Sequence, residues 1–135
     1  MPGLEVHLVT PEREVWSGEA DFVTARGVDG DLGVLPGHAP LLAALAVGPV
    51  FIDAGGSRTA VAVDGGFLHV AHEDDITRVD ILAEHAVLPE ELGRGDDAEA
   101  HERRAEELRS EDRPDEAREE RAKAATRRRV AGNHS

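Results

Sequence analysis

The 135-residue sequence contains no cysteine and no tyrosine, and aromatic residues make up only 3% of it. The absence of cysteine excludes disulfide bonds and thiol chemistry, and it fits a cytosolic protein. With one tryptophan and three phenylalanines, any core has to be built mainly from valine, leucine and isoleucine. No apolar run approaches the roughly 20 residues that span a bilayer, and no secretory signal peptide is expected at the N-terminus.

Positive charge is also scarce. The chain has 15 Lys and Arg against 28 Asp and Glu, which gives a formal net charge of −13. Nearly all of the acidic excess lies in residues 1–90. A surface of this sign repels nucleic acid and anionic lipid headgroups, so neither is expected to bind directly. Any association with a membrane is therefore expected to go through another protein.

The sequence also contains no recognisable grouping of residues typical of a catalytic or metal-binding site. His69 and His72 are three apart on an expected strand and face opposite sides of it. The serines lack the context of a nucleophile elbow, and Asp74-Asp75 fits a solvated turn. The sequence predicts no catalytic residue, no metal site and no cofactor.

The most distinctive stretch is GDLGVLPGHAPLL, residues 30–42. It predicts a brief apolar strand with a rigid turn at each end, because Pro36 and Pro40 each fix φ at about −65°. Leu41 and Leu42 carry apolar surface that must enter a core or a partner. For His38 we favour a turn histidine that bonds nearby backbone or touches a partner, because no second ligand or nucleophile lies close in sequence.

The rest of residues 1–90 indicates short strands. Apolar and polar residues alternate over residues 4–9, and residues 15–26 form a second extended region. Residues 43–47, which end at Gly48-Pro49, fit either a short helix or a buried strand. Further strands are expected at 50–53, 58–63, 67–72 and 76–83, with turns at 54–57, 64–66 and 73–75. This spacing predicts a β-sandwich or barrel.

Glu, Arg and Ala dominate residues 91–135. Asp96 and Asp97 are placed to cap a helix over residues 98–110, which Arg113-Pro114 breaks before a second helix. Because the apolar stripe is thin, a solvated tail with fluctuating helix is the alternative. The basic residues of this tail are Arg121, Lys123, Arg127, Arg128 and Arg129. Three successive arginines exceed what the dipole of one helix end requires.

Residues 4–91 resemble the epsilon subunit of bacterial F-type ATP synthases. The resemblance is carried by GDLGVLPGHAPLLAAL, by VWSGEA at residues 15–20 and by VDGGFLHV at residues 63–70. It implies a mainly β N-terminal sandwich at residues 1–90, with two packed sheets of about ten strands. It also implies a C-terminal helical hairpin at residues 91–135 that folds back on the sandwich or extends along the central stalk.

By the same resemblance the chain is a non-catalytic rotor subunit at the cytoplasmic face of the bacterial plasma membrane. Its partners would be the gamma subunit and the ring of c subunits. Asp31 matches an acidic turn that faces the c ring, and His38 matches a turn residue close to the rotor interface. Gly33 would shape the motif, and Leu41 and Leu42 would pack under the turn. The basic tail would contact the catalytic alpha/beta head and restrain ATP hydrolysis.

One family feature is altered. Some epsilon subunits bind ATP through Ile/Leu-Asp-x-x-Arg-Ala, whereas residues 92–97 here are LGRGDD. Asp96 stands in place of the arginine and would repel phosphate, so regulatory ATP binding is not expected. Two other functions remain open. A free-standing nucleotide-sensing module would need the isolated chain to bind ATP, and a β-sandwich enzyme would need an acid/base or metal cluster.

Overall fold

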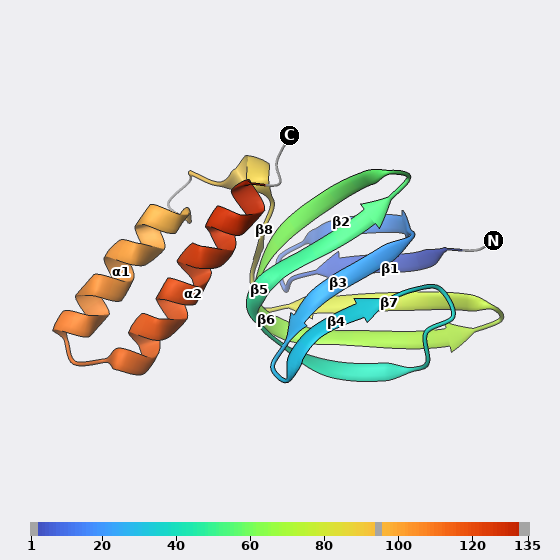
Figure 1. The fold of residues 1–135 in the computed structure, drawn as a ribbon, viewed down its shortest axis with the longest axis horizontal. Helices are drawn as coiled ribbons and strands as arrows, with labels where there is room; N and C mark the ends of the chain where they lie inside the picture. The colour runs from blue at the N-terminus through green and yellow to red at the C-terminus, as the bar shows by residue number, and fades with distance from the viewer. Residues whose placement is uncertain (1–2, 94–95, 133–135) are drawn as a thin grey trace.

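The computed structural model describes residues 3–93 and 96–132. The N-terminal part is a β-sandwich, and two antiparallel helices stand beside it (Figure 1). The strands are β1 (Leu4–Val9), β2 (Glu14–Ala20), β3 (Phe22–Gly27), β4 (Gly30–Val34), β5 (Leu41–Ala54), β6 (Ser57–Glu73), β7 (Ile76–Ala83) and β8 (Ala86–Val87). A 3-10 turn, η1 (Pro89–Glu91), leads to helices α1 (Ala98–Ser110) and α2 (Pro114–Ala131).

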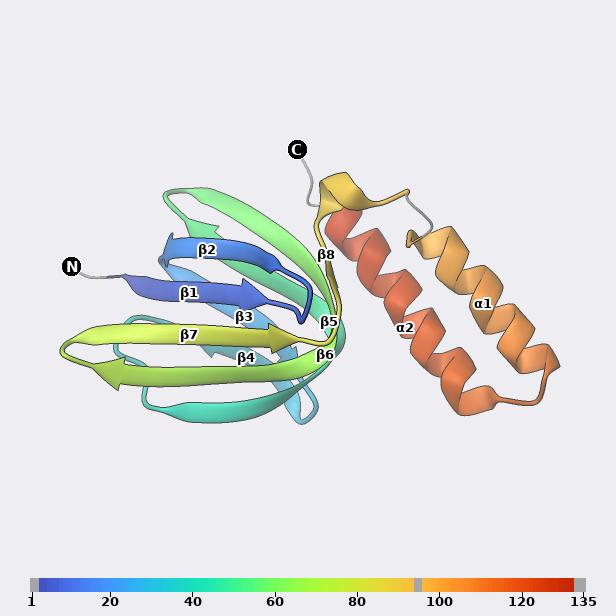
Figure 2. The same cartoon turned by 180° about the vertical axis from the view of Figure 1, so that it is seen from behind.

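Two long strands connect the layers of the sandwich. The strand order is β2-β1-β7-β6-β5-β3-β4, with β8 also paired to β6. The first part of β5 pairs with the last part of β6, from Leu41 opposite Val70 to Leu45 opposite Gly66. The remainder of β5 pairs with the beginning of β6 and with β3 on the other side. Both strands therefore contribute to both layers, which Figure 2 shows from behind.

The long strands decide one alternative that the sequence left open and correct one expectation. Residues 43–47 are strand and not helix, and the expected interruptions at 48–49 and 64–66 are bends inside β5 and β6. The described residues therefore form eight strands instead of about ten. Gly66 makes its bend possible: its φ is +136°, and an added Cβ would lie 2.1 Å from the carbonyl oxygen of Leu82. Backbone pairing continues through such a bend.

The core between the layers consists of aliphatic side chains. Leu4, Val6 and Leu8 of β1 are fully buried, as their alternation predicted. The main cluster draws its buried residues from all seven longer strands and from Ala86 of β8, and Trp16 packs against it partly buried. No buried member of this main cluster comes from α1 or α2.

The C-terminal helices form the expected hairpin, and α1 spans the residues that the sequence predicted. The side chain of Asp97 caps α1 by accepting a hydrogen bond of 2.9 Å from the amide of Ala100. Figure 1 shows α2 between α1 and the sandwich. There it covers a small second cluster, Phe51, Ala60, Ala62, Val87 and Val130, with Leu92 at its edge. The hairpin is thus folded back on the outer face of β5 and β6.

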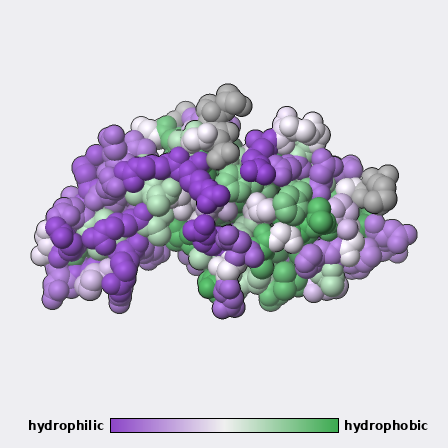
Figure 3. Space-filling view, in the orientation of Figure 1, coloured by the Kyte–Doolittle hydropathy of each residue, from purple (hydrophilic) through white to green (hydrophobic). Residues whose placement is uncertain are grey.

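In the view of Figure 3 the hairpin surface is mostly hydrophilic, and hydrophobic surface gathers on the sandwich. Within the described part of the chain, neither helix is long and apolar enough to cross a membrane.

Candidate functional site

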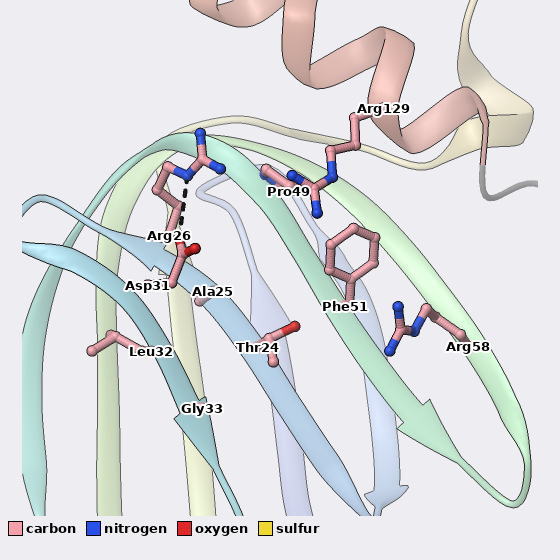
Figure 4. A pocket seen from close by; sticks show the side chains of 10 residues that line it. All are labelled: Thr24, Ala25, Arg26, Asp31, Leu32, Gly33, Pro49, Phe51, Arg58 and Arg129. Carbon is pink, nitrogen blue, oxygen red and sulfur yellow. Dashed lines mark hydrogen bonds and ion pairs between the residues drawn. The ribbon is translucent and has the colours of Figure 1, made fainter.

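The acidic residue of the central motif lies near the beginning of β4. The Asp31 side chain is exposed and accepts a hydrogen bond from Arg26 Nε at 3.3 Å (Figure 4). Gly33 lies opposite Thr24 on β3, and an added Cβ would lie 3.1 Å from the ring of Phe22. Asp31 is therefore accessible to a partner, while Gly33 is small because an aromatic ring lies against it.

The turn that follows β4 is held from two directions. The His38 amide donates to the Leu35 carbonyl at 3.1 Å, and His38 Nδ1 lies 2.7 Å from the carbonyl oxygen of Ala39. The Gly37 amide donates to Thr77 Oγ1 at 2.8 Å, which ties the turn to β7. His38 is thus a turn histidine bonded to nearby backbone, as the sequence indicated.

The two leucines at the beginning of β5 point in opposite directions. Leu41 packs against the main core, whereas the side chain of Leu42 is 68% exposed. The expectation that both pack under the turn is right for Leu41 and wrong for Leu42. The reason is the alternation of side chains along a strand, since residues 41–47 are strand and not helix.

Leu42 belongs to an exposed apolar face of the sandwich, which we define as Leu42, Phe67 and Leu82. Phe67 lies opposite Leu82 on β7 and opposite Ala44 on β5, and cross-strand neighbours share one face of a sheet. Phe67 is 52% exposed and Leu82 is 51% exposed. Beside them runs a shallow groove of about 360 Å³, lined by Val9, Thr10, Pro11, Gly66, Phe67, Leu82, Ala83 and Glu84.

Sequence reasoning missed Phe67 and Leu82 as surface residues, although the signal was present. Leu68 and Ile81 face the core, so their neighbours Phe67 and Leu82 have to face outward on a strand. Exposed aromatic and aliphatic side chains on adjacent strands are typical of a surface that a partner covers.

A second concavity lies where the hairpin meets the sandwich, with a volume of about 390 Å³. Figure 4 shows Arg58 and Arg129 on either side of Phe51 in its wall. Their guanidinium carbons lie 5.0 and 5.4 Å from the ring centroid. Arg58 also donates to Asp53 at 2.8 and 3.2 Å, and this hydrogen bond raises the pKa of Arg58. These groups are held by contacts within the chain.

The basic residues of the tail do not form one surface. Arg121 is exposed, and Lys123 lies 3.6 Å from Glu120. Arg128 pairs with Glu102 at 2.7 Å, whereas Arg127 is only 1% exposed. The expectation that all three successive arginines are displayed for a partner is wrong for Arg127, because successive helical side chains point in different directions. In this position it faces the sandwich.

Arg127 makes a two-pronged ion pair with the sandwich. Its Nη1 and Nη2 donate to the two carboxylate oxygens of Asp64 on β6, at 2.5 and 2.7 Å. Its Nε donates to the carbonyl oxygen of Asp96 at 3.2 Å. Asp64 is 6% exposed and lies in the stretch that the sequence assigned to a turn. The strongest polar contact between hairpin and sandwich therefore joins two residues 63 positions apart.

Asp96 lies where the family motif for ATP has its arginine, and the neighbouring motif residues 94 and 95 lie outside the described part of the chain. Burial raises the pKa of Asp96, but hydrogen bonds from His85 and His101 and the charge of Arg127 outweigh it and lower the pKa to about 2. The carboxylate is ionised and already paired with Arg127 of its own chain, so it opposes phosphate binding at this position.

No three His, Asp or Glu side chains within residues 3–93 and 96–132 are placed to hold a metal ion. The described residues do place an exposed apolar face, the exposed side chain of Asp31 on β4 and a docked hairpin at the surface.

Comparison with known proteins gives a consistent result. The family model described as "ATP synthase, Delta/Epsilon chain, beta-sandwich domain" matches residues 3–89. The ATP synthase epsilon chain of Frankia casuarinae is 55% identical over 86 residues, which cover 63% of this chain and 96% of that one. The epsilon chain of Streptomyces avermitilis is 45% identical over 109 residues, 80% of this chain and 82% of that one. For the epsilon chain of Thermobifida fusca, with 50% identity over 92 residues, the match covers 65% of the relative's length.

Solved structures extend the likeness to the helices. A chain in the Euglena gracilis mitochondrial ATP synthase structure, described as OSCP/F1/c-ring in rotational state 1, has a TM-score of 0.69 and 26% identity. The alignment covers 98% of this chain and 79% of that one. A chain from the Tetrahymena thermophila mitochondrial ATP synthase has a TM-score of 0.52 at 21% identity, over 67% of this chain and 70% of that one, which shows the fold alone. The chain belongs to the family of ATP synthase delta/epsilon chains.

Proposed function

We propose that the chain is a non-catalytic subunit of the central stalk of an F-type ATP synthase, in which its sandwich binds the gamma subunit and the ring of c subunits. The observation that carries the proposal is the apolar face of Leu42, Phe67 and Leu82, exposed on a domain whose family is shown. Such a face is stabilised when a partner removes it from water, at about 25 cal/mol per Å².

The polar contacts of the proposal lie in the central motif. Asp31 is exposed, and its contact with the polar loop of a c subunit would orient the ring more than it would add affinity. Gly33 and the turn at His38 keep this part of the backbone in one path. The c-ring assignment is supported by the Euglena structure, whose description names a c-ring.

In this proposal the chain is peripheral to the cytoplasmic face of the bacterial plasma membrane and couples proton-driven rotation of the ring to the catalytic head. The hairpin would act on the alpha/beta head and restrain ATP hydrolysis through its basic residues. Arg121, Arg128 and Arg129 are exposed, but Arg129 also lies against the Phe51 ring, so Arg121 and Arg128 are the candidates, while Arg127 acts by holding the hairpin.

The test replaces the apolar face. The double variant Phe67→Ser/Leu82→Ser should lose co-purification with gamma while its sandwich remains folded, as measured by thermal unfolding. Ile76→Ser is the matched control, because Ile76 is 45% exposed and lies on the same strand as Leu82. It lies about 20 Å along the strand from Leu82. Equal recovery of gamma with the double variant and with the control would contradict the proposal.

The alternative, a free-standing nucleotide-sensing module, is tested by calorimetric titration of the isolated chain with ATP. We expect no saturable binding below about millimolar concentration, because Asp96 and its cations are already paired with one another. Saturable binding well below millimolar would favour the sensing module.

A further inference from the structure

A cluster of charged side chains is buried where the hairpin meets the sandwich. Its five members come from four segments: Asp64 from β6, Asp96 from the residues before α1, His101 from α1, and Glu120 and Arg127 from α2. His101 is 4% exposed and Arg127 is 1% exposed. Charged and titratable groups are rarely buried to this degree unless each has a partner.

Both nitrogens of the His101 ring face carboxylates. Nε2 contacts Asp96 Oδ1, and Nδ1 contacts Glu120 Oε2. An ionised carboxylate only accepts hydrogen bonds, so each ring nitrogen has to carry a proton for both contacts to form. Burial raises the pKa of Glu120, but its hydrogen bond with His101 and the charges of Lys123 and Arg104 together outweigh this and lower the pKa. The pKa of Asp96 is about 2, so both carboxylates are ionised at neutral pH. The arrangement therefore describes an imidazolium.

This imidazolium is linked to the sandwich through one carboxylate. The same Oδ1 of Asp96 that faces His101 also lies 3.3 Å from Arg127 Nη2, and Arg127 is paired with Asp64 on β6. The second oxygen of Asp96, Oδ2, lies 2.6 Å from His85 Nε2, in the connection between β7 and β8. The charge on His101 thus offsets the burial of a carboxylate that holds the hairpin in place.

Other charged groups face the cluster from the helices. Arg104 Nη1 of α1 lies 3.1 Å from His101 Nδ1, and Lys123 Nζ of α2 lies 3.6 Å from Glu120. Arg104 can only donate a hydrogen bond, so its contact with Nδ1 would require that nitrogen to be unprotonated. The Glu120 oxygen is the closer neighbour of Nδ1, and this favours the protonated ring.

Apolar contact between hairpin and sandwich is small. In the second cluster, Val130 is the sole buried residue that the described part of the helices contributes, and it meets Phe51, Ala60, Ala62 and Val87. A contact of this size is weak beside the free energy of a buried, paired charge network, in which loss of one partner is strongly destabilising. Docking is therefore sensitive to the charge state of the cluster.

We propose that His101 is a proton-dependent lock that keeps the hairpin docked on the sandwich while the ring is an imidazolium and releases it when the proton is lost. A neutral ring leaves one nitrogen without a proton in front of a carboxylate. Asp96 and Glu120 then remain as partly buried negative charges with less compensation. Release exposes these groups to water, where no partner is needed.

The direction with pH follows from proton binding. Release exposes the ring to water, and histidine side chains in water change charge near pH 6.5. Above that range docking takes up one proton, so the docking constant falls by up to tenfold for each pH unit. On the acid side the pKa of Asp96 is lowered to about 2. The contribution of ionised Asp96 to docking is complete above its ordinary pKa of 3.8 and is lost as the pH falls towards 2. Docking is therefore strongest in weakly acidic solution.

The experiment measures the distance between hairpin and sandwich in the full chain. Because the chain has no cysteine, spin labels on the pair Ser57→Cys and Ser110→Cys report one distance between β6 and the end of α1. We expect one narrow distance distribution near pH 6 and a growing, broader population as the pH rises to about 8.5. An unchanged distribution over this range would overturn the proposal.

Variants assign the effect to one ring. In His101→Gln the released fraction should be the same at every pH, since glutamine does not titrate. His72→Gln is the matched control, because His72 is exposed on β6, away from the cluster, and should keep the wild-type profile. His85→Gln should keep the pH dependence. If the pH dependence were lost in His85→Gln and kept in His101→Gln, the switch would lie at His85 and the proposal would be overturned.

A second measurement does not depend on a variant that folds. Nitrogen chemical shifts of the His101 ring distinguish an imidazolium from either neutral tautomer. Both ring nitrogens should be protonated in the docked chain near pH 6. A neutral His101 ring in the docked chain at that pH would contradict the lock even if the hairpin moves with pH.

Discussion

At the scale of single residues, Arg127 has a role that the adjacent arginines do not share. Arg127 and Arg128 are adjacent in a run of three arginines, yet one is buried against Asp64 and the other pairs with Glu102 at the surface. The free-energy consequences differ accordingly. A buried pair that loses one partner leaves an uncompensated charge, whereas an exposed pair contributes about 0–1 kcal/mol.

We therefore predict that Arg127→Gln weakens hairpin docking by roughly 3–5 kcal/mol. Arg128→Gln, the matched control, should change it by less than about 1 kcal/mol. The measurement is hydrogen exchange of the α2 amides in the full chain, which reports the free energy of local opening. Equal protection of α2 in both variants would show that the Asp64 pair does not hold the hairpin.

Gly66 is the second residue whose substitution has a defined outcome. In Gly66→Ala the new Cβ would lie 2.1 Å from the Leu82 carbonyl oxygen and 2.9 Å from Ala83 Cα, at a φ of +136°. The strand has to move, so we expect a loss of more than about 2 kcal/mol of sandwich stability. Gly56→Ala is the control, because Gly56 also has a positive φ, +83°, but has open space around it.

Chemical denaturation of both glycine variants provides the measurement. In the control Gly56→Ala, the alanine adopts a positive φ, which costs roughly 1 kcal/mol. Its Cβ meets no other atom. The difference between the variants therefore isolates the bend of β6. Similar denaturation midpoints for the two variants would mean that the backbone of β6 shifts to accommodate a side chain at Gly66. The bend would then not require this glycine.

At the scale of elements, the sandwich and the hairpin are stabilised by different means. The main core is closed without a buried residue from either helix. The helices bury mainly alanines against each other, Ala100, Ala105, Ala117 and Ala124 among them. Isolated helices of this length are marginal in water, so we expect the hairpin to depend on the sandwich far more than the sandwich depends on the hairpin.

Truncation after Leu92 should accordingly leave a cooperative unfolding transition, observed by circular dichroism in the β-sheet region. A modest loss of stability is expected, since Phe51 loses its cover by the helix. The melting temperature should fall by several degrees for each kcal/mol lost. A truncated chain that unfolds without cooperativity would place the domain boundary elsewhere and would make the hairpin part of the core.

The elements also show what the sequence could and could not predict. The bounds of α1 follow from local signals, the cap at Asp97 and the proline at 114. Strand alternation identified the buried face of β1. The bends at residues 48–49 and 64–66 were not distinguishable from turns, because glycine and proline give the same local signal for both. Only the pairing partner, far away in the chain, keeps the strand continuous.

The candidate site residues divide in the same way. His38 lies in a local turn and contacts nearby backbone, as the sequence indicated, whereas Asp31, which the resemblance matched to an acidic turn, lies in β4. The pairing of Asp64 with Arg127 and the contacts of His101 join segments that are distant in sequence. No periodicity or spacing brings these residues together, so only the tertiary structure could show them.

At the scale of the whole molecule, an acidic sandwich carries a docked hairpin whose remaining surface arginines face outward. Arg121 and Arg128 are both exposed on α2. If the hairpin restrains hydrolysis through a negatively charged face of the catalytic head, these two residues supply the attraction. Charge contacts of this kind are worth about 0.5–1 kcal/mol each and weaken as salt screens them.

We predict that Arg121→Gln/Arg128→Gln raises ATP hydrolysis by the assembled complex roughly two- to fivefold per charge, with assembly intact. Raised salt should produce a similar rise in the wild type and a smaller one in the double variant. Arg118→Gln/Arg109→Gln is the matched control, since these arginines are also exposed on the hairpin and, like Arg128, carry an ion pair, but they lie outside the C-terminal basic run. The measurement is the ATPase activity of membranes that carry each variant at two salt concentrations. The basic residues would have no part in restraint if hydrolysis by the double variant matched that of the control at both concentrations.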